Sequence, residues 1–81
     1  MRVRVKLFAV ARQRIGQDSL EVELPDKPTI GHLRQALLEQ FPPLASVVPH
    51  ARFAINSEYA SDAAALPAAA EIAIIPPVSG G

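Results

Sequence analysis

The N-terminal part of the chain contains two runs that alternate apolar and polar side chains with the two-residue period of a β-strand. Over residues 2–9 the inward positions are Val3, Val5 and Leu7, and the outward positions are Arg2, Arg4 and Lys6. Over residues 18–24 they are Leu20, Val22 and Leu24, against Ser19, Glu21 and Glu23. Two such runs in succession predict an antiparallel pair. We expect Arg4 and Lys6 to face Glu21 and Glu23 across it, a contribution of about 0.2–1 kcal/mol per pair.

A polar connector and one amphipathic helix complete the first half of the chain. Residues 12–16 interrupt the alternation, and Gly16 offers a turn position. After the prolines at 25 and 28, Thr29 is a suitable N-cap for a helix over residues 30–41. Its apolar positions, at helical spacing, are Ile30, Leu33, Leu37 and Phe41, and Pro42-Pro43 stop it. His32 flanks this apolar stripe, which favours a solvated histidine over a catalytic one.

The second half reads as short elements. Residues 44–50 are expected to be irregular or to form one short helical turn. Residues 52–55 and 58–60 read as two strands joined by a turn at Asn56-Ser57. Residues 61–70 are alanine-rich and fit either a loop or a turn of helix. Residues 71–75 are β-rich, and Pro76-Pro77 close that strand.

This order of elements predicts an α+β fold of the β-grasp, or ubiquitin-like, type. One main helix lies between two strand pairs and covers one face of a mixed sheet. A right-handed connection places the last strand parallel beside the first. We expect a single domain over residues 1–77 and a flexible C-terminal Gly-Gly tail over residues 78–81.

Composition argues against several classes of binding site and partner. A chain of 81 residues has room for one domain, and it has no cysteine and only two separated histidines, so neither disulfides nor a bound metal are expected. Eight basic residues balance eight acidic ones, which argues against nucleic acid or an anionic membrane as the main partner. No secretory signal or membrane-spanning run is visible, so the simplest location is the cytoplasm.

Two apolar residues break the predicted pattern. Phe8 shares its face of the first strand with Arg2, Arg4 and Lys6. In the last strand Ile72 and Ile74 fit the core, which leaves Ile75 on the opposite face beside Ala73. If the first and last strands are neighbours, Phe8 and Ile75 form an exposed apolar patch, a common mark of a protein interface. The alternative is that a loop covers both.

The segment after Pro76-Pro77 is the second anomaly. Proline lacks the N–H that a ladder needs, so the chain leaves the sheet there and could extend about 20 Å at roughly 3.3 Å per residue. Gly80 and Gly81 have no Cβ and can enter a slot too narrow for other residues. The terminal carboxylate is a poor acyl electrophile, but an acyl-adenylate is a good one. A sulfur donor could then displace AMP and leave a thiocarboxylate, so we expect a carrier rather than an enzyme with a side-chain active site.

The last eight residues, Ile74-Ile75-Pro76-Pro77-Val78-Ser79-Gly80-Gly81, resemble the C-terminal signature of the MoaD/ThiS-type ubiquitin-like sulfur carriers, specifically the small subunit of molybdopterin synthase. The resemblance extends over the whole chain. Residues 5–9 with Arg12 and Gly16 match the family's opening, and residues 55–59 match its internal turn. One departure is the turn before the last strand, where such carriers commonly have an Asp-Gly-Asp-like sequence and this chain has Pro67-Ala68-Ala69-Ala70.

The resemblance implies a reaction cycle and a set of partners. An E1-like enzyme uses ATP to adenylate Gly81, and a sulfurtransfer system makes the thiocarboxylate. The tail enters the large catalytic subunit, where sulfur passes to cyclic pyranopterin monophosphate in molybdenum cofactor biosynthesis. Two carriers flank a large-subunit dimer, a heterotetramer, and this chain itself binds no cofactor. The residues implied in partner binding are Phe8, Ile75, Pro76, Pro77, Val78 and Ser79.

Three other readings stay open. The chain could carry sulfur for thiamine thiazole or cysteine synthesis. It could be a ubiquitin-like modifier joined to target lysines through Gly81. It could also be a β-grasp binding module with an incidental tail, in which case a residue added after Gly81 would leave its function intact.

Overall fold

A computed structural model describes residues 1–76 of the chain. Within this range the elements are β1 (Arg2–Leu7), α1 (Ala9–Ile15), β2 (Ser19–Glu23), α2 (Ile30–Gln40), the 3-10 turns η1 (Pro42–Leu44) and η2 (Val48–His50), β3 (Arg52–Ile55), β4 (Glu58–Ala60) and β5 (Ile72–Ile75). The two predicted N-terminal strands, the helix, the hairpin and the last strand therefore form at the expected places. The 61–70 segment is a loop.

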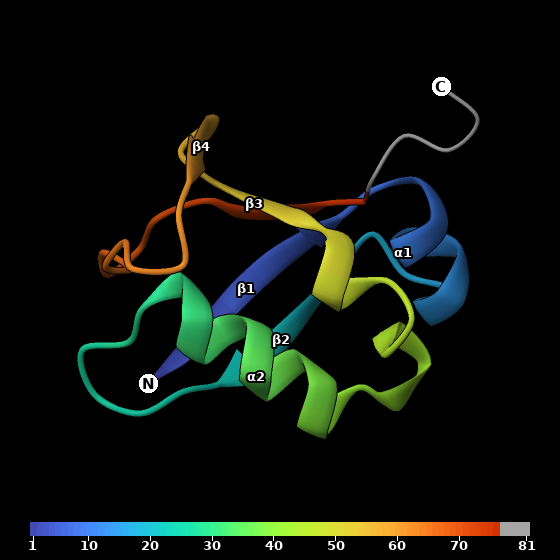
Figure 1. The fold of residues 1–81 in the computed structure, drawn as a ribbon, viewed down its shortest axis with the longest axis horizontal. Coiled ribbons are helices and arrows are strands. Elements are labelled where there is room, and N and C mark those ends of the chain that lie inside the picture. The colour runs from blue at the N-terminus through green and yellow to red at the C-terminus, as the bar shows by residue number, and fades with distance from the viewer. Residues whose placement is uncertain (77–81) are drawn as a thin grey trace.

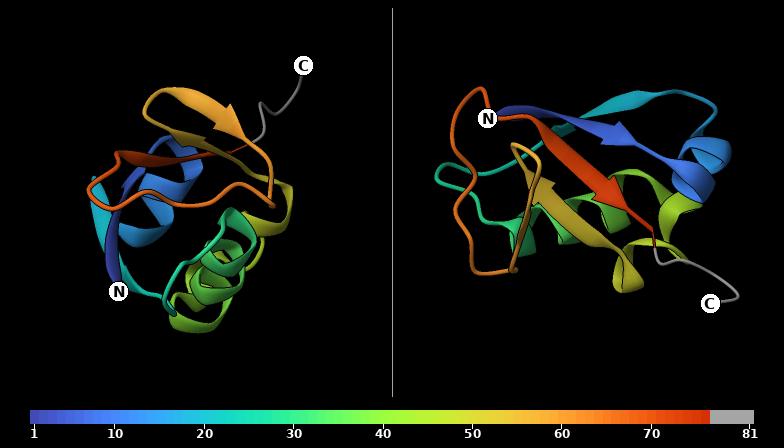
Figure 2. Two further views of the ribbon diagram at one scale, coloured as in Figure 1. Left: turned by 90° about the vertical axis from the view of Figure 1, so that its left-hand side faces the viewer. Right: turned by 90° about the horizontal axis from the view of Figure 1, so that it is seen from above.

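The five strands form one mixed sheet in the order β2-β1-β5-β3-β4. β1 and β5 pair in parallel, and the other neighbours pair antiparallel. α2 lies across one face of the sheet (Figure 1). Seen from above, β1, β5 and β3 lie side by side in front of α2 (Figure 2). This is the predicted β-grasp arrangement, with the last strand parallel beside the first.

The core lies between α2 and the sheet. Its fully buried members include residues from the apolar stripe of the helix and from the inward positions of four strands: Ile30, Leu33, Leu37, Val5, Val22, Phe53, Ile72 and Ile74. Thr29 caps the helix as expected, because its Oγ1 accepts from the backbone N–H of His32 at 3.3 Å. His32 is solvent-exposed, and its Nδ1 in return accepts from the N–H of Thr29 at 3.0 Å. This reciprocal pair satisfies two backbone donors at the start of the helix, and the N–H groups of Ile30 and Gly31 donate to the carbonyls of Ala64 and Asp62.

The prediction for residues 8–16 was wrong in its local structure. β1 ends at Leu7 instead of continuing to residue 9, and the expected polar connector contains helix α1. Ala11 is fully buried and Ile15 packs against the core, so two apolar positions four residues apart face inward. The helix ends at Gly16, which has φ 79° and donates its N–H to the carbonyl of Arg12 at 2.7 Å.

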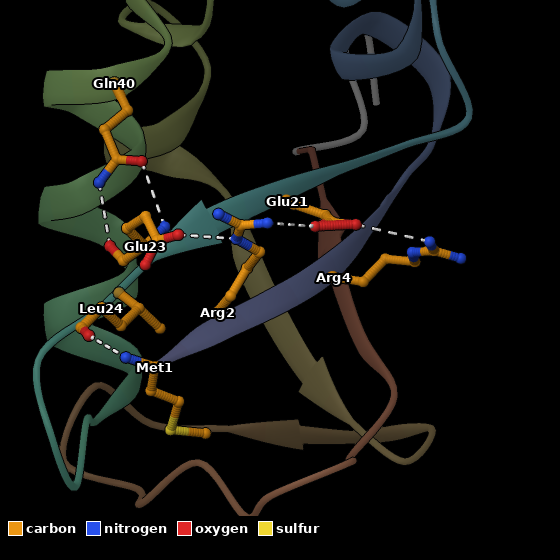
Figure 3. A network of polar contacts seen from close by, with 7 residues as sticks. All are labelled: Met1, Arg2, Arg4, Glu21, Glu23, Leu24 and Gln40. Atoms are coloured by element: carbon orange, nitrogen blue, oxygen red, sulfur yellow. Dashed lines mark hydrogen bonds and ion pairs between the residues drawn. The ribbon is translucent and has the colours of Figure 1, made fainter.

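The predicted charge pairs between β1 and β2 were displaced along the ladder. Arg4 does face Glu21, but Glu23 lies opposite Arg2, and Lys6 lies opposite Ser19. Arg2 therefore donates its Nε to Glu23 at 2.6 Å, a hydrogen bond that raises the pKa of Arg2 (Figure 3). Lys6 pairs instead with Glu71, before β5. The register depends on the length that α1 takes up between the strands, which alternation alone does not reveal.

A side chain from α2 forms hydrogen bonds with the last residue on the free edge of β2. The Gln40 amide accepts from the N–H of Glu23 at 3.3 Å and donates to its carbonyl at 2.9 Å (Figure 3). At the end of the same strand, Leu24 and Met1 exchange backbone hydrogen bonds of 2.6 and 2.9 Å. The outward backbone groups of Glu23 are therefore already paired, which makes this end of β2 a poor template for another strand.

Arg34 of α2 joins three segments of the chain. Its Nη1 donates to the carbonyls of Val48 and Ala51 at 2.6 and 2.9 Å. Its Nη2 donates to Asp62 at 2.8 Å, and its guanidinium lies 5.0 Å from the centre of the Phe53 ring. The helix, the approach to β3 and the loop after β4 are therefore held by one side chain.

Two tight turns use residues other than glycine at positive φ. Asn56 and Ser57, with φ of 50° and 71°, form the two-residue turn between β3 and β4, the pattern of a type I′ hairpin. In the loop before β5, Ala69 has φ 60° and the N–H of Ala70 reaches the carbonyl of Pro67 at 3.4 Å. Residues 67–70, whose sequence departs from that of the family, therefore still form a turn. Ala69 adopts there a conformation that favours glycine.

Candidate docking surface at the base of the C-terminal segment

Parallel pairing of β1 and β5 brings two predicted site residues together. Leu7 lies opposite Ile74 in the ladder, so Phe8 and Ile75 follow at the same end of two neighbouring strands. Phe8 is 48% exposed, and Ile75 is half-buried. Both line one hollow of about 310 Å³. The expected patch therefore forms, although Phe8 reaches it as the N-cap of α1 and not as a strand residue.

This hollow, which we call the outer-face hollow, lies over a row of residues across four strands, and the two alanines at the centre of the row form its floor. Lys6 lies opposite Ala73, Ala73 opposite Ala54, and Ala54 opposite Tyr59. The two alanines are short, while the residues around them are long, so the sheet is hollowed at its centre. All four members of the row line the hollow, together with Phe8, Ser57, Glu71 and Ile75. It opens on the face of the sheet away from α2.

Tyr59 is the member of this surface that sequence reasoning missed. Its side chain is 64% exposed, and the guanidinium of Arg52 lies 5.3 Å from its ring centre. An exposed aromatic ring in contact with arginine is typical of a binding surface. The signal was present in the sequence, because a two-residue turn at Asn56-Ser57 places Tyr59 beside Ala54 on the outer face.

Charges at the rim of the hollow are largely compensated. Lys6 and Glu71 form an ion pair at 3.3 Å, with side chains 52% and 55% exposed. On the other side of Phe8 a second hollow of about 380 Å³ contains the Arg12–Asp18 ion pair at 3.0 Å. An apolar floor with paired charges at its edge suits docking of a protein better than attraction of a strongly charged ligand.

The remaining predicted site residues lie at or beyond residue 76, the last residue that the structure describes. Pro76 follows β5 directly and is buried, so its side chain is not part of the exposed surface. Pro77, Val78, Ser79, Gly80 and Gly81 lie outside the described residues. The expected boundary of the domain at residue 77 falls there as well.

The titratable side chains around the outer-face hollow are few. Within residues 1–76, no group of three or more histidine, aspartate or glutamate side chains is placed to hold a metal ion. The titratable groups of the outer-face hollow are Lys6, Glu71 and Tyr59, and the first two are ion-paired. In the same range, no helix has the length and apolar character needed to cross a membrane.

Comparison with known proteins agrees with this architecture. The chain is 38% identical over 79 residues to the molybdopterin synthase sulfur carrier subunit of Arabidopsis thaliana, which covers 98% of this chain and 82% of that protein. The protein of the same name from Chlamydomonas reinhardtii is 37% identical over 83 residues, with both chains covered completely. The crystal structure of small archaeal modifier protein 1 (SAMP1) from Haloferax volcanii matches with a TM-score of 0.83 and 30% identity over all of both chains. The ThiS family matches residues 5–81, from β1 through Gly81, and the chain belongs to that family.

Proposed function

We propose that this protein is the sulfur carrier subunit of a molybdopterin synthase and that the carboxylate of Gly81 carries the sulfur. The observation that supports this most is the agreement over nearly the whole chain with curated relatives of that name. The fold fits the role, because β5 ends beside the outer-face hollow and the sequence then runs through two prolines to Gly80-Gly81. A surface next to the base of the tail would hold a partner while the tail reaches its active site.

The proposed chemistry needs only the end of the main chain. The Gly81 carboxylate attacks ATP on an E1-like enzyme, which forms the acyl-adenylate and releases pyrophosphate. Hydrosulfide attacks the carbonyl carbon and displaces AMP, which leaves the thiocarboxylate. In the large catalytic subunit this sulfur passes to cyclic pyranopterin monophosphate, and water restores the carboxylate. Two glycines at the end allow close approach to the reacting carbon.

This chain would contribute recognition to the cycle and its partners would contribute catalysis. Phe8 and Ile75, with Tyr59 added by the structure, offer the apolar contact near the tail. Nucleotide would bind to the activating enzyme, since this sequence has no glycine-rich phosphate loop.

Intact-mass measurement tests the proposal directly. The protein ending at Gly81 is incubated with the activating enzyme, ATP and a sulfide source. We expect a mass increase equal to the replacement of one oxygen by sulfur. A variant with one alanine added after Gly81 is the matched control, and it should stay unchanged because the acyl position has moved. An unmodified wild-type chain, under conditions that modify a known carrier, would contradict the proposal.

A protein modifier is the second candidate, and the match to SAMP1 is the observation that favours it. In that case Gly81 would form an isopeptide bond with target lysines. Mass analysis of cell extracts separates the two functions, because a carrier is recovered as a free thiocarboxylate and a modifier as a branched conjugate. Sulfur transfer from the thiocarboxylated chain can be measured with purified large subunit and with the acceptors of the thiamine thiazole and cysteine pathways. The acceptor that takes up the sulfur would distinguish the three carrier functions.

A further inference from the structure

The outer-face hollow has the size and shape to receive a single side chain. Its volume of about 310 Å³ is at the lower end of ligand pockets, which begin at about 300 Å³. Ala54 is 5% exposed and lines the bottom of the hollow. Ala73 lies beside it and is half-buried. Around this floor stand three large side chains, those of Phe8, Tyr59 and Ile75.

Arg52 provides a charge beside this hollow. Five other cationic side chains of the described part form ion pairs with carboxylates: Arg2, Arg4, Lys6, Arg12 and Arg34. Within residues 1–76 no carboxylate pairs with Arg52, which lies instead over the ring of Tyr59. It is exposed and sits opposite Ile75 in the ladder, at the base of the C-terminal segment.

A guanidinium held on an aromatic face is prepared to bind an anion. The ring contact restrains the side chain, and the donors at the guanidinium edge stay available for hydrogen bonds. Carboxylates match that edge with two parallel hydrogen bonds. Because tyrosine and arginine are the residue types that most often dominate binding energy, the Arg52–Tyr59 pair and the hollow form one recognition unit.

We propose that the large synthase subunit presents one large apolar side chain to the hollow over Ala54 and Ala73, with a carboxylate beside it that binds Arg52. This inference rests on the proposed function. The large subunit is the occupant because the curated relatives are named as subunits of the synthase. An apolar floor suits a lasting assembly better than a brief encounter with the activating enzyme, because permanent interfaces are more hydrophobic than transient ones.

Binding to the purified large subunit tests the two halves separately. Ala73→Leu fills the hollow, and Ala73→Val does so with a side chain that strands favour. Each should raise Kd about tenfold or more. Arg52→Glu should raise Kd by about tenfold and Arg52→Lys by less, because lysine keeps the charge without the fork. Lys27→Glu is the control, with the same change of charge away from the hollow, and should bind as wild type does.

Thermal unfolding separates a loss of binding from a loss of folding, and two further binding measurements test the charge of Arg52. Thermal unfolding should show the wild-type transition for both Arg52 variants and for Ala73→Val. Added salt should weaken wild-type binding more than it weakens Arg52→Glu. Among charge reversals of aspartate or glutamate on the large subunit, one should restore binding of Arg52→Glu and none should restore Ala73→Leu. If no reversal restores it, the assignment of Arg52 is overturned.

The outcomes also separate this inference from the proposed function. If wild type is neither thiocarboxylated nor bound by the large subunit, both fall. If wild type does both and the Ala73 and Arg52→Glu variants bind within about twofold of it, only the inference falls. Variants that bind the large subunit normally but are no longer activated would assign the hollow to the activating enzyme and overturn the proposal as stated.

Discussion

The side chains on the two faces of β5 differ in burial and in what they contact, although they alternate along one short strand. Ile72 and Ile74 are 1% and 0% exposed and pack under α2, whereas Ala73 and Ile75 are half-buried on the face that carries the outer-face hollow. Side chains along a strand point alternately to opposite faces, so neighbouring residues belong to different environments. One face contributes to stability and the other is available for recognition.

The same division holds for charged side chains. Arg34, on the side of the helix, has a side chain only 22% exposed and four partners in three segments. Lys6, on the outer face, has one exposed partner in Glu71. Since exposed ion pairs contribute little to stability, the outer face can change its charges at small cost to the fold. Stability and binding should therefore be separable by mutation.

The largest expected effect is on the core face of β5. Ile74→Ala removes a fully buried side chain and should lower the free energy of unfolding by about 2–5 kcal/mol. Ile75→Ala, one residue along, should lower it much less, because that side chain is only half-buried. Urea denaturation of both variants measures the difference. Equal losses at the two positions would contradict the division between the faces.

The second largest expected effect on stability comes from replacing a basic side chain on the helix side and comparing it with one on the outer face. Arg34→Met removes hydrogen bonds to two backbone carbonyls and to Asp62, and should cost about 2 kcal/mol, the range for hydrogen bonds to charged groups. Lys6→Met removes only an exposed pair and should change stability by less than about 1 kcal/mol. Denaturant midpoints at matched slopes provide the readout. A larger loss for Lys6→Met would show that the outer face carries stability after all.

Most of the fold was predictable because its elements have strong periods. Alternation located β1 and β2, the β-rich composition of residues 71–75 located β5, and the spacing from Ile30 to Leu37 located α2, with proline on both sides of it. Helix α1 was missed because seven residues with three polar side chains make a weak pattern. A helix this short is marginal in isolation, and its formation depends on tertiary packing of Ala11 and Ile15.

The docking surface was predictable only in part. Phe8 and Ile75 stood out because each broke the pattern of its own strand, and the parallel pairing that joins them follows from the handedness of the connection. The floor of the hollow depends on the antiparallel pairing of β3 with β5, which brings Ala54 beside Ala73. Long-range register of that kind is not encoded in the period of a single segment.

A smaller effect is expected at the start of α2, the helix that covers the core face of the sheet. His32→Ala removes the acceptor for the N–H of Thr29 and should cost about 1 kcal/mol. His32→Gln should retain most of the stability, because glutamine at this position completes a capping box. Thermal unfolding of the two variants would show the difference. If His32→Ala is as stable as wild type, the hydrogen bond to the ring does not support the helix.

The smallest expected effect is a gain at the rim of the hollow. Ser57 has φ 71°, where a side chain is strained, and glycine is preferred after asparagine in this type of hairpin turn. Ser57→Gly should therefore raise the free energy of unfolding by about 0.5 kcal/mol, the strain relieved less the added entropy of the unfolded chain. Ser57→Ala keeps the side chain at positive φ and should bring no such gain. Urea denaturation of the two variants measures the difference, and an equal gain for Ser57→Ala would show that the positive φ of this turn is not the source of strain.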